Sequence, residues 1–239
     1  GNYYNASVTE SRVPTFDCGP QPQQNISVNS SLSASTFLFG DTTTIPTYKT
    51  VKESIYNVNF SRNILFTNPS GPYVETGMQF IRNNTILDCN YAKIDTKDGT
   101  GITLDTVTDI TIQNCLINTS TGHDIIQINA RAYRNTIQNN NITTQNSVVA
   151  VGIDFVSSTN TNNNITNNTF YGTTGTAISA SSNLKFNGSI YGNQFKHTTP
   201  IGTNAFAFDY CPYGYGNYYN ESAIATSIPT KDCGPQPAL

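Results

Sequence analysis

The sequence predicts an all-β protein built as a parallel β-helix, or β-solenoid, with coils of about 25 residues. Three observations lead to this fold class. Short apolar segments recur through the middle of the chain at steps of 24 to 28 residues, apolar and polar residues alternate inside each segment, and helical periodicity is absent. A unit of this length cannot bury its own apolar face, whereas stacked units bury a continuous one.

Each period contains two of these apolar segments, so each coil has at least two short strands separated by polar turns. Leucine-rich repeats have a similar length, but their Leu-x-x-Leu-x-Leu pattern is missing. The variation in spacing falls in the turns, which tolerate insertion. The anchors of the first ladder of segments are Ile86, Ile112, Ile137, Ile165 and Ile190, and those of the second ladder are Met78, Ile102, Ile126, Ile153, Ile178 and Phe206.

A polar column supports this register, because each segment of the first ladder continues into an Asn, Asp, Gly or Cys pair. Stacked Asn side chains can hydrogen-bond to the coils above and below. Asn can also simply be the turn residue at each corner, and we expect a mixture of the two. The pairs are Asp88-Cys89, Asn114-Cys115, Asn139-Asn140, Asn167-Asn168 and Gly192-Asn193.

The chain opens on GNYYNASVTESRVPTFDCGPQPQQ and closes on GNYYNESAIATSIPTKDCGPQPAL. The two phrases align without a gap at a separation of 215 residues, as Gly1 with Gly216 and Cys18 with Cys233. Phe16 faces Lys231, so the phrases are diverged copies of one segment. We expect the phrase to close one β-helix and to link it to the next repeat or subunit.

This period suggests four parts of the chain. The β-helix coils occupy the third part, and the two copies of the closing phrase lie at either end. The expected parts are 1–24, a linker or closing segment homologous to 216–239; 25–76, the N-terminal lead-in and cap; 77–210, the β-helix coils; and 211–239, a disulfide-stapled closing segment and linker.

Five cysteines become four plus a copy when the period is considered. Cys89 and Cys115 hold similar places in adjacent coils, and a coil spacing of about 4.8 Å falls inside the Cα separation of a disulfide. We therefore predict the pair Cys89–Cys115, with Cys211 paired to Cys233. Cys18 would find its partner outside the chain in a preceding repeat; an intermolecular bond and a free thiol are the alternatives.

The composition favours an extracellular chain. Only 11% of the 239 residues are charged, the net charge is −3 and no basic patch exists, which argues against a nucleic-acid partner. No apolar stretch approaches the roughly 20 residues of a membrane span. The chain begins at Gly1 without a signal peptide, so we expect a mature chain or a piece of a longer one.

Asn-x-Ser/Thr sequons point to the same compartment, secreted or at the cell surface. Some arise by chance in a chain so rich in Asn and Thr. Covalent N-glycans would keep this uncharged surface soluble, and we expect no other cofactor. The sequons lie at Asn5, Asn25, Asn29, Asn59, Asn83, Asn118, Asn141, Asn164, Asn167, Asn187 and Asn220.

The run NTILDCNYAKIDTKDGTGITLDTVTDITIQNC (84–115) resembles the right-handed parallel β-helix repeats of archaeal and bacterial surface proteins, called NosD-like or pectate-lyase-like. Those repeats often read LDCNG…I.G…GI.L…NVTI.NC, and residues 77–210 are similar to this pattern. GNYYN resembles the GNYW phrase that closes many NosD-like domains, with Tyr in place of Trp and without the acidic Asp/Gly run. The resemblance implies a right-handed β-helix of an archaeal-type surface protein, and it implies no single activity, because this fold carries lyases, hydrolases, adhesins and structural proteins.

No catalytic constellation emerges from the residues. Lyases of this fold use acids that bind Ca²⁺ with an Arg or Lys base, and polygalacturonase-like hydrolases use paired Asp with Gly-His-Gly and Arg-x-Lys. Gly122-His123-Asp124 is the nearest fragment, but it lacks the second Gly and the acid pair. We expect no catalytic residue. Four carboxylates that might share a face lie in different columns of the coil: Asp105, Asp109, Asp124 and Asp154.

We also expect no metal site. The cysteines are far apart in the sequence, and His123 and His197 lie in different coils without ligand spacing. A NosD-like accessory role for copper therefore lacks the required clusters of His, Met and Cys.

Tyrosines crowd the closing phrases and could form a sugar-binding platform, but a capping or docking surface fits them better. The open end of a β-helix exposes apolar columns and unpaired backbone groups that must be covered. The tyrosines expected at contacts between units are Tyr3, Tyr4, Tyr213, Tyr215, Tyr218 and Tyr219.

Two functions from different classes remain. The first is a structural repeat unit of a glycosylated extracellular surface protein, filament or adhesin, joined head to tail to copies of itself or to adjacent repeats; such contacts do not close and so give filaments. The second is a carbohydrate-binding or polysaccharide-degrading β-helix protein, with surface glycans as partners. We favour the first, which is not an enzyme.

Overall fold

The computed structural model describes residues 36–39, 63–66, 73–75, 78–80, 83–96, 100–119, 122–144, 149–157, 161–181 and 187–235. The chain divides into two compact units, residues 1–34 and 35–239, and every described residue belongs to the second. The predictions for Cys18, Tyr3, Tyr4, Asn5, Asn25, Asn29 and Asn59 lie outside the described residues.

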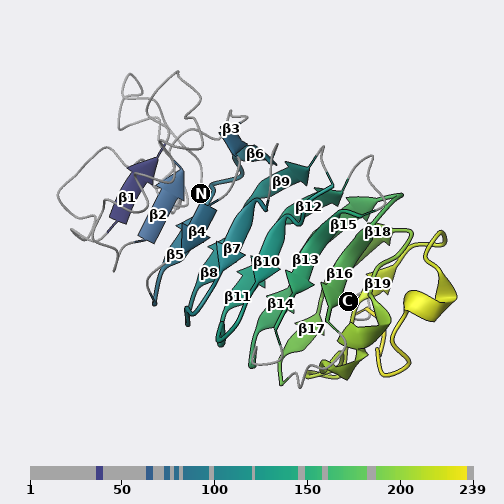
Figure 1. The fold of residues 1–239 in the computed structure, drawn as a ribbon. Coiled ribbons are helices and arrows are strands. Elements are labelled where there is room, and N and C mark those ends of the chain that lie inside the picture. Colours follow the sequence, from purple (N-terminus) through teal and green to yellow (C-terminus); the bar gives the residue numbers. More distant parts are fainter. Residues whose placement is uncertain are drawn as a thin grey trace, which may run out of the picture. The chain divides into compact units, whose positions relative to one another are not determined.

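Three parallel sheets form the second unit (Figure 1), and the chain visits sheets A, B and C in turn in each coil. This confirms the predicted parallel β-helix. Sheet A contains β1 (Thr36–Phe39), β2 (Asn63–Phe66), β5 (Ile86–Asp88), β8 (Thr111–Gln113), β11 (Thr136–Gln138), β14 (Asn164–Thr166) and β17 (Ser189–Tyr191). Sheet B contains β3 (Tyr73–Glu75), β6 (Lys93–Thr96), β9 (Leu116–Thr119), β12 (Asn141–Thr144), β15 (Thr169–Gly172), β18 (Gln194–His197) and β19 (Tyr218–Tyr219). Sheet C contains β4 (Met78–Phe80), β7 (Ile102–Leu104), β10 (Ile126–Ile128), β13 (Val151–Phe155) and β16 (Thr176–Ala180).

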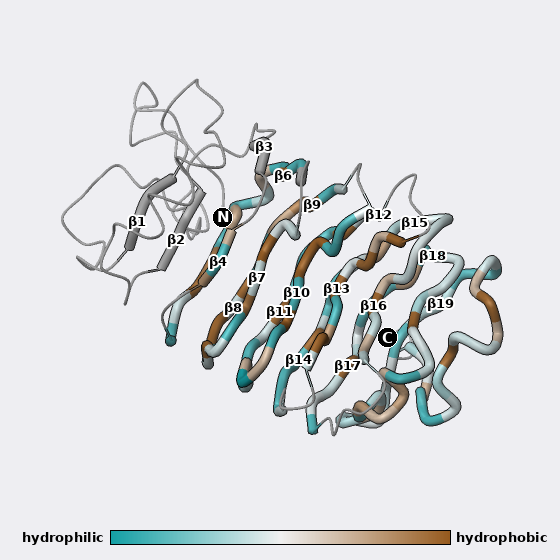
Figure 2. Tube along the Cα trace, viewed as in Figure 1, coloured by the Kyte–Doolittle hydropathy of each residue, from teal (hydrophilic) through white to brown (hydrophobic). Residues whose placement is uncertain are grey.

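The interior is made of apolar columns, one residue per coil, because alternate residues of each short strand point inward. Figure 2 shows hydrophobic and hydrophilic residues interspersed along the coils in this way. Phe170 stacks on Phe195 with ring centroids 5.0 Å apart. The inward columns are Leu87, Ile112, Ile137, Ile165 and Ile190 in sheet A; Ile94, Ile117, Ile142, Phe170 and Phe195 in sheet B; and Met78, Ile102, Ile126, Ile153, Ile178 and Ile201 in sheet C.

Two of the predicted anchors are wrong. Leu87, not Ile86, pairs with Ile112, and the Ile86 side chain is 37% exposed. Ile201, not Phe206, continues the sheet C column beside Ile178. Phe206 lies instead in a 3₁₀ turn, η2 (Thr203–Ala207), that packs against the core.

The turns between strands place single residues in the left-handed backbone region. At the corner between sheets A and B, Asn114, Asn139, Asn167 and Gly192 have φ between 56° and 68°. Asn and Gly are the residues that adopt this conformation at least cost. The turn role proposed for asparagine is therefore confirmed at these positions, and each turn brings the next residue into the interior.

Candidate functional site

Asparagine side chains form a continuous ladder inside the corner between sheets A and B. The Asn140 carboxamide accepts the backbone N–H of Cys115 at 2.9 Å, and Asn140 in turn donates its N–H and Nδ2–H to Oδ1 of Asn168, both at 3.0 Å. Asn193 and Asn217 repeat the pattern in the following coils. All four side chains are buried. The predicted polar column is therefore both a set of turns and a hydrogen-bonded stack.

Asp232 ends this ladder. Its Oδ1 accepts the Asn217 N–H at 2.8 Å and its Oδ2 accepts Asn217 Nδ2 at 2.6 Å, which are the bonds that an asparagine of the next coil would make. The same carboxylate accepts the Tyr219 hydroxyl at 2.7 Å and the Gly234 N–H at 3.0 Å. A buried ladder that stopped at Asn217 would leave polar groups unsatisfied, so Asp232 completes it.

Residues 211–235, which we term the closing segment, are held on the last coil by three further contacts. Strand β19 pairs in parallel with β18, matching Phe195 with Tyr219. The Tyr219 ring stacks on Phe195 at 5.2 Å and 8° and so extends the aromatic column. Burial, followed by the hydrogen bond to Asp232, raises the pKa of Tyr219 and keeps its hydroxyl protonated as the donor. The segment thus replaces a full coil with one short strand and a carboxylate.

The structure contains both predicted disulfides. Cys211 and Cys233 join the two ends of the closing segment, with Cα atoms 5.7 Å apart. Cys89 and Cys115 lie at a Cα separation of 4.8 Å. Their expected equivalence is wrong in detail, because Ala92 precedes Cys115 in the ladder column: the Leu116 N–H donates to Ala92. The corner after β5 holds two extra residues, Asn90 and Tyr91, and Cys89 lies at its start.

The tyrosines of the closing segment have different environments. Tyr213 and Tyr218 are 71% and 45% exposed. The Tyr191 ring meets Tyr213 and Tyr215 edge to face, at 5.2 and 5.8 Å. Tyr219 has a role within its own chain, which sequence reasoning missed together with that of Asp232. The exact recurrence of Asn-Tyr-Tyr and Asp-Cys-Gly in both phrases was the available signal for both residues.

The seven described sequons fall into two groups. Asn83, Asn141, Asn167 and Asn187 present exposed side chains. Three others are half-buried and engaged: the Asn118 amide donates to Asp95 at 3.2 Å, Asn164 accepts the Ser189 hydroxyl at 2.8 Å, and Asn220 has its Oδ1 enclosed. Burial of the amide hinders a modification that needs an accessible nitrogen.

The histidines and acids considered from the sequence remain scattered. His197 is buried and its pKa is lowered to about 4 by that burial, whereas His123 is exposed. Asp109 forms an ion pair with Arg134 at 2.7 Å, and Arg134 holds the pKa of Asp109 below its usual value. Burial, and then the nearby charge of Asp154, raises the pKa of Asp124 to about 6. Asp124 and Asp154 are therefore closer electrostatic neighbours than their separate columns suggested.

The comparisons with known proteins give one family. The profile of the family described as periplasmic copper-binding protein (NosD) matches residues 25–223. The chain belongs to the NosD family. No curated protein and no solved structure matches it. The resemblance drawn from residues 84–115 is confirmed, and the match covers the described coils together with the start of the closing segment.

The residues described in this NosD-family member do not fit the copper named by the family description. Copper sites are built from clustered imidazole, thiolate and thioether groups. Within the described residues, no three His, Cys, Asp or Glu side chains lie close enough together to hold a metal ion. The four described cysteines are in disulfides, and Met78 is buried in the core.

Two features bear on the compartment. Disulfides persist in oxidising compartments, so the two bonds point to a location outside the reducing cytosol. A search of the described residues for helices with the length and apolarity of a membrane span finds none.

Proposed function

We propose that this chain is a structural β-helix unit of a glycosylated extracellular surface protein or filament, joined head to tail to copies of itself through the GNYYN…DCGPQP segments. In this proposal the chain has no enzymatic role, its cofactors are covalent N-glycans alone, and its partners are like units. The two disulfides, the exposed sequons and the periplasmic location in the family's description support the compartment.

One observation carries the proposal: the contacts that close the β-helix are made by residues that recur 215 positions earlier. Asn217 and Asp232 complete the ladder, Tyr219 extends the aromatic column, and Cys233 forms the disulfide. A Cβ on Gly216 would overlap the Asp232 carboxylate, so glycine is required there too. The matching residues of the first phrase are Gly1, Asn2, Tyr4, Asp17 and Cys18.

The differences between the phrases support the same conclusion. Residues 1–20 and 216–235 differ at eight positions, and five of these are exposed in the closing segment, among them Ala225 and Lys231. Buried Ser227, matched by Arg12, is the exception. Sequence has been retained where contacts are made, so the first phrase has the chemistry needed to close a β-helix. A unit with such a phrase at each end of its coils is suited to head-to-tail assembly.

The test removes Cys233 and follows Cys211. In a Cys233→Ser variant of the full chain, we expect Cys211 to bond to Cys18 of another molecule, because the first phrase of a neighbour takes the vacated place. Non-reducing mass spectrometry of a mixture of ¹⁴N- and ¹⁵N-labelled chains would identify the bond and separate links between molecules from links within one. Negative-stain microscopy of the wild type should show fibres with a regular axial repeat.

Matched variants sharpen the test. Adding Asp17→Ala to Cys233→Ser should reduce the Cys18–Cys211 product severalfold, whereas adding Glu10→Ala, at a position where the phrases differ, should leave it unchanged. A free Cys211, or a bond to Cys18 within one chain, would contradict head-to-tail joining. Release of unsaturated or reducing sugars from a polyuronate by the wild type would instead favour the enzymatic alternative.

A further inference from the structure

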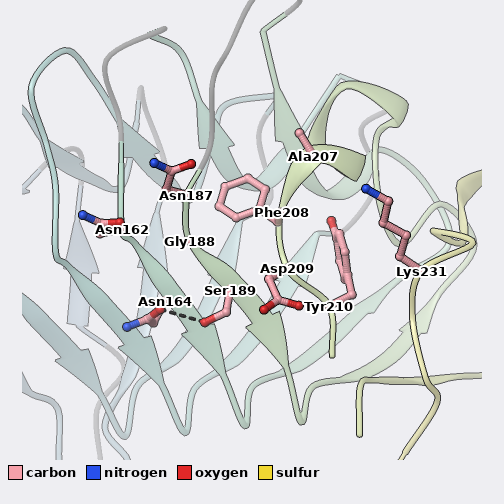
Figure 3. A pocket seen from close by; sticks show the side chains of 10 residues that line it. All are labelled: Asn162, Asn164, Asn187, Gly188, Ser189, Ala207, Phe208, Asp209, Tyr210 and Lys231. Atoms are coloured by element: carbon pink, nitrogen blue, oxygen red, sulfur yellow. Dashed lines mark hydrogen bonds between the residues drawn. The ribbon is translucent and has the colours of Figure 1, made fainter. Parts of the chain in front are cut away.

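An open cavity of about 590 Å³ lies on the outward face of sheet A at the C-terminal end of the β-helix (Figure 3). Its volume falls in the range of small-molecule sites. Four stretches of chain line it, and they come from the last coils and the closing segment. The lining residues are Asn162, Asn164, Asn187, Gly188, Ser189, Ala207, Phe208, Asp209, Tyr210 and Lys231.

The walls of this cavity carry hydrogen-bonding groups of several kinds. Asn162 and Asn187 are exposed, and Figure 3 shows their carboxamides on one side with the Lys231 ammonium on the other. Within the described residues, these three side chains have no hydrogen-bond partner. Donors and acceptors without protein partners are available to a ligand.

Three further groups stand in register on sheet A. Asn164 pairs with Ser189, and Ser189 forms a bridge with Asp209, so these residues follow one another at the spacing of the coils. The Ser189 hydroxyl donates to Asn164 Oδ1 at 2.8 Å, which leaves the Asn164 amide nitrogen as a donor. Asp209 Oδ1 accepts the Cys211 N–H at 2.9 Å, which holds the carboxylate in place.

The floor of the cavity is rigid. Phe208 and Tyr210 are buried, with exposed fractions of 2% and 1%, and the Tyr210 hydroxyl donates to the Ala205 carbonyl at 2.8 Å. Polar groups that converge over a fixed apolar floor are typical of binding sites. The cavity is therefore formed before any ligand arrives.

The charges of the lining select the class of ligand. Asp209 and Lys231 have opposite signs, and every other lining side chain is neutral. An acidic polysaccharide would place its carboxylates against Asp209, at a cost from like-charge repulsion. A neutral sugar presents hydroxyl donors and acceptors all around its ring and suits amide, hydroxyl and carboxylate partners. We propose that this cavity binds a neutral saccharide, a role that goes beyond the structural function above.

Two sources of saccharide are compatible with this geometry. Asn187 begins the sequon Asn187-Gly188-Ser189, so a glycan attached there starts at the edge of the cavity. A glycan of a neighbouring molecule has the same chemistry. The chemistry is shared, and the experiment separates the sources.

The experiment uses the full chain, made without glycans in a host that forms disulfides, and titrates it with N-acetylglucosamine and separately with galacturonic acid. We expect saturable NMR shifts centred on residues 187–189 and 207–210 with the neutral sugar, and at least tenfold weaker binding of the acid. Lys231→Ala combined with Asn162→Gly should weaken binding of the neutral sugar at least tenfold. Lys196→Ala combined with Asn139→Gly is the matched control, because both residues are exposed and Asn139, like Asn162, has positive φ.

The glycosylated chain identifies the source. If free sugar binds only after Asn187→Gln, the chain's own glycan occupies the cavity; if it binds glycosylated wild type, the cavity serves a foreign glycan. Either result supports the proposal. It is overturned if no saturable shift occurs, if the test and control variants bind equally, or if galacturonic acid binds as tightly as N-acetylglucosamine. None of these outcomes depends on whether the chain forms filaments.

Discussion

Asp232 accepts two hydrogen bonds from Asn217, at 2.8 and 2.6 Å, and so occupies the place that an asparagine holds in the preceding coils. A carboxylate suits a terminal position because it only accepts, whereas an asparagine there would also present an amide that needs a further acceptor. The two residues are 15 positions apart in sequence, but they are consecutive members of one column.

Removal of this carboxylate should loosen the closing segment. We expect Asp232→Ala to lower the free energy of unfolding by about 3 kcal/mol, since several buried donors lose their acceptor. Asp232→Asn, which keeps one acceptor oxygen, should lose less. Glu221→Ala, an exposed acid of the same segment, is the control, and urea denaturation measures all three. Equal stability of Asp232→Ala and Glu221→Ala would show that Asp232 is not the end of the ladder.

Buried His197 should make the protein sensitive to mild acid. Its Nδ1 accepts the Thr199 N–H at 3.1 Å, and its Nε2 lies 2.8 Å from the Thr144 hydroxyl, which donates to the Thr174 carbonyl. Burial lowers its pKa to about 4, so between pH 6.5 and 4 the unfolded chain binds a proton that the folded chain does not. The free energy of unfolding should therefore fall as the pH is lowered through this window. His197→Asn should remove that slope, and His123→Asn should retain it.

Asp124 should act in the opposite direction. Burial first, and then the charge of Asp154, raises its pKa to about 6, so ionisation is disfavoured in the folded state. Its contribution to stability is present at low pH and is lost as the pH rises from about 4 to about 6. Asp124→Asn in the His197→Asn background should therefore raise the melting temperature at pH 7 and leave it unchanged at pH 3.5. Asp105→Asn is the control, and an equal effect at both pH values would contradict this account.

Gly172 leaves the space that the His197 ring occupies. A Cβ on Gly172 would lie 2.5 Å from His197 Nε2 and would overlap the Thr144 hydroxyl. We expect Gly172→Ala to destabilise the protein by about 1–3 kcal/mol, the usual cost of overpacking. Gly202→Ala, whose Cβ would approach the Ile178 carbonyl only to 3.5 Å, is the control. A His197→Ser change should recover part of the loss; the absence of recovery would place the strain elsewhere.

Glycan mapping should separate the described sequons. In a glycosylating host, we expect occupancy at the exposed Asn83, Asn141, Asn167 and Asn187. The half-buried Asn118, Asn164 and Asn220 should be largely unmodified. Peptide mass spectrometry after enzymatic deglycosylation in H₂¹⁸O measures each site. High occupancy at Asn118 or Asn220 would mean that modification precedes folding at those positions.

Much of the fold was predictable because its cause is local. Alternation of apolar and polar residues sets the strands, and recurrence at about 25 residues sets the stacking. Cys211 and Cys233 could be paired from the period alone. Ile86 could not be placed, since two extra residues in the corner after β5 displace the match on cysteine by one residue at Leu87, and a shift of one reverses which face a side chain occupies.

The sequence by itself determined the β-helix, both disulfides and the polar column, because each rests on a repeat that can be counted along the chain. Only the tertiary structure decided that Asp232 replaces an asparagine, that Tyr219 continues the stack of Phe170 and Phe195, and that Ile201 rather than Phe206 follows Ile178. These contacts form where the period ends. There the chain leaves the coil, and the last coil meets whichever side chain satisfies its unpaired groups, at a sequence distance that no repeat specifies.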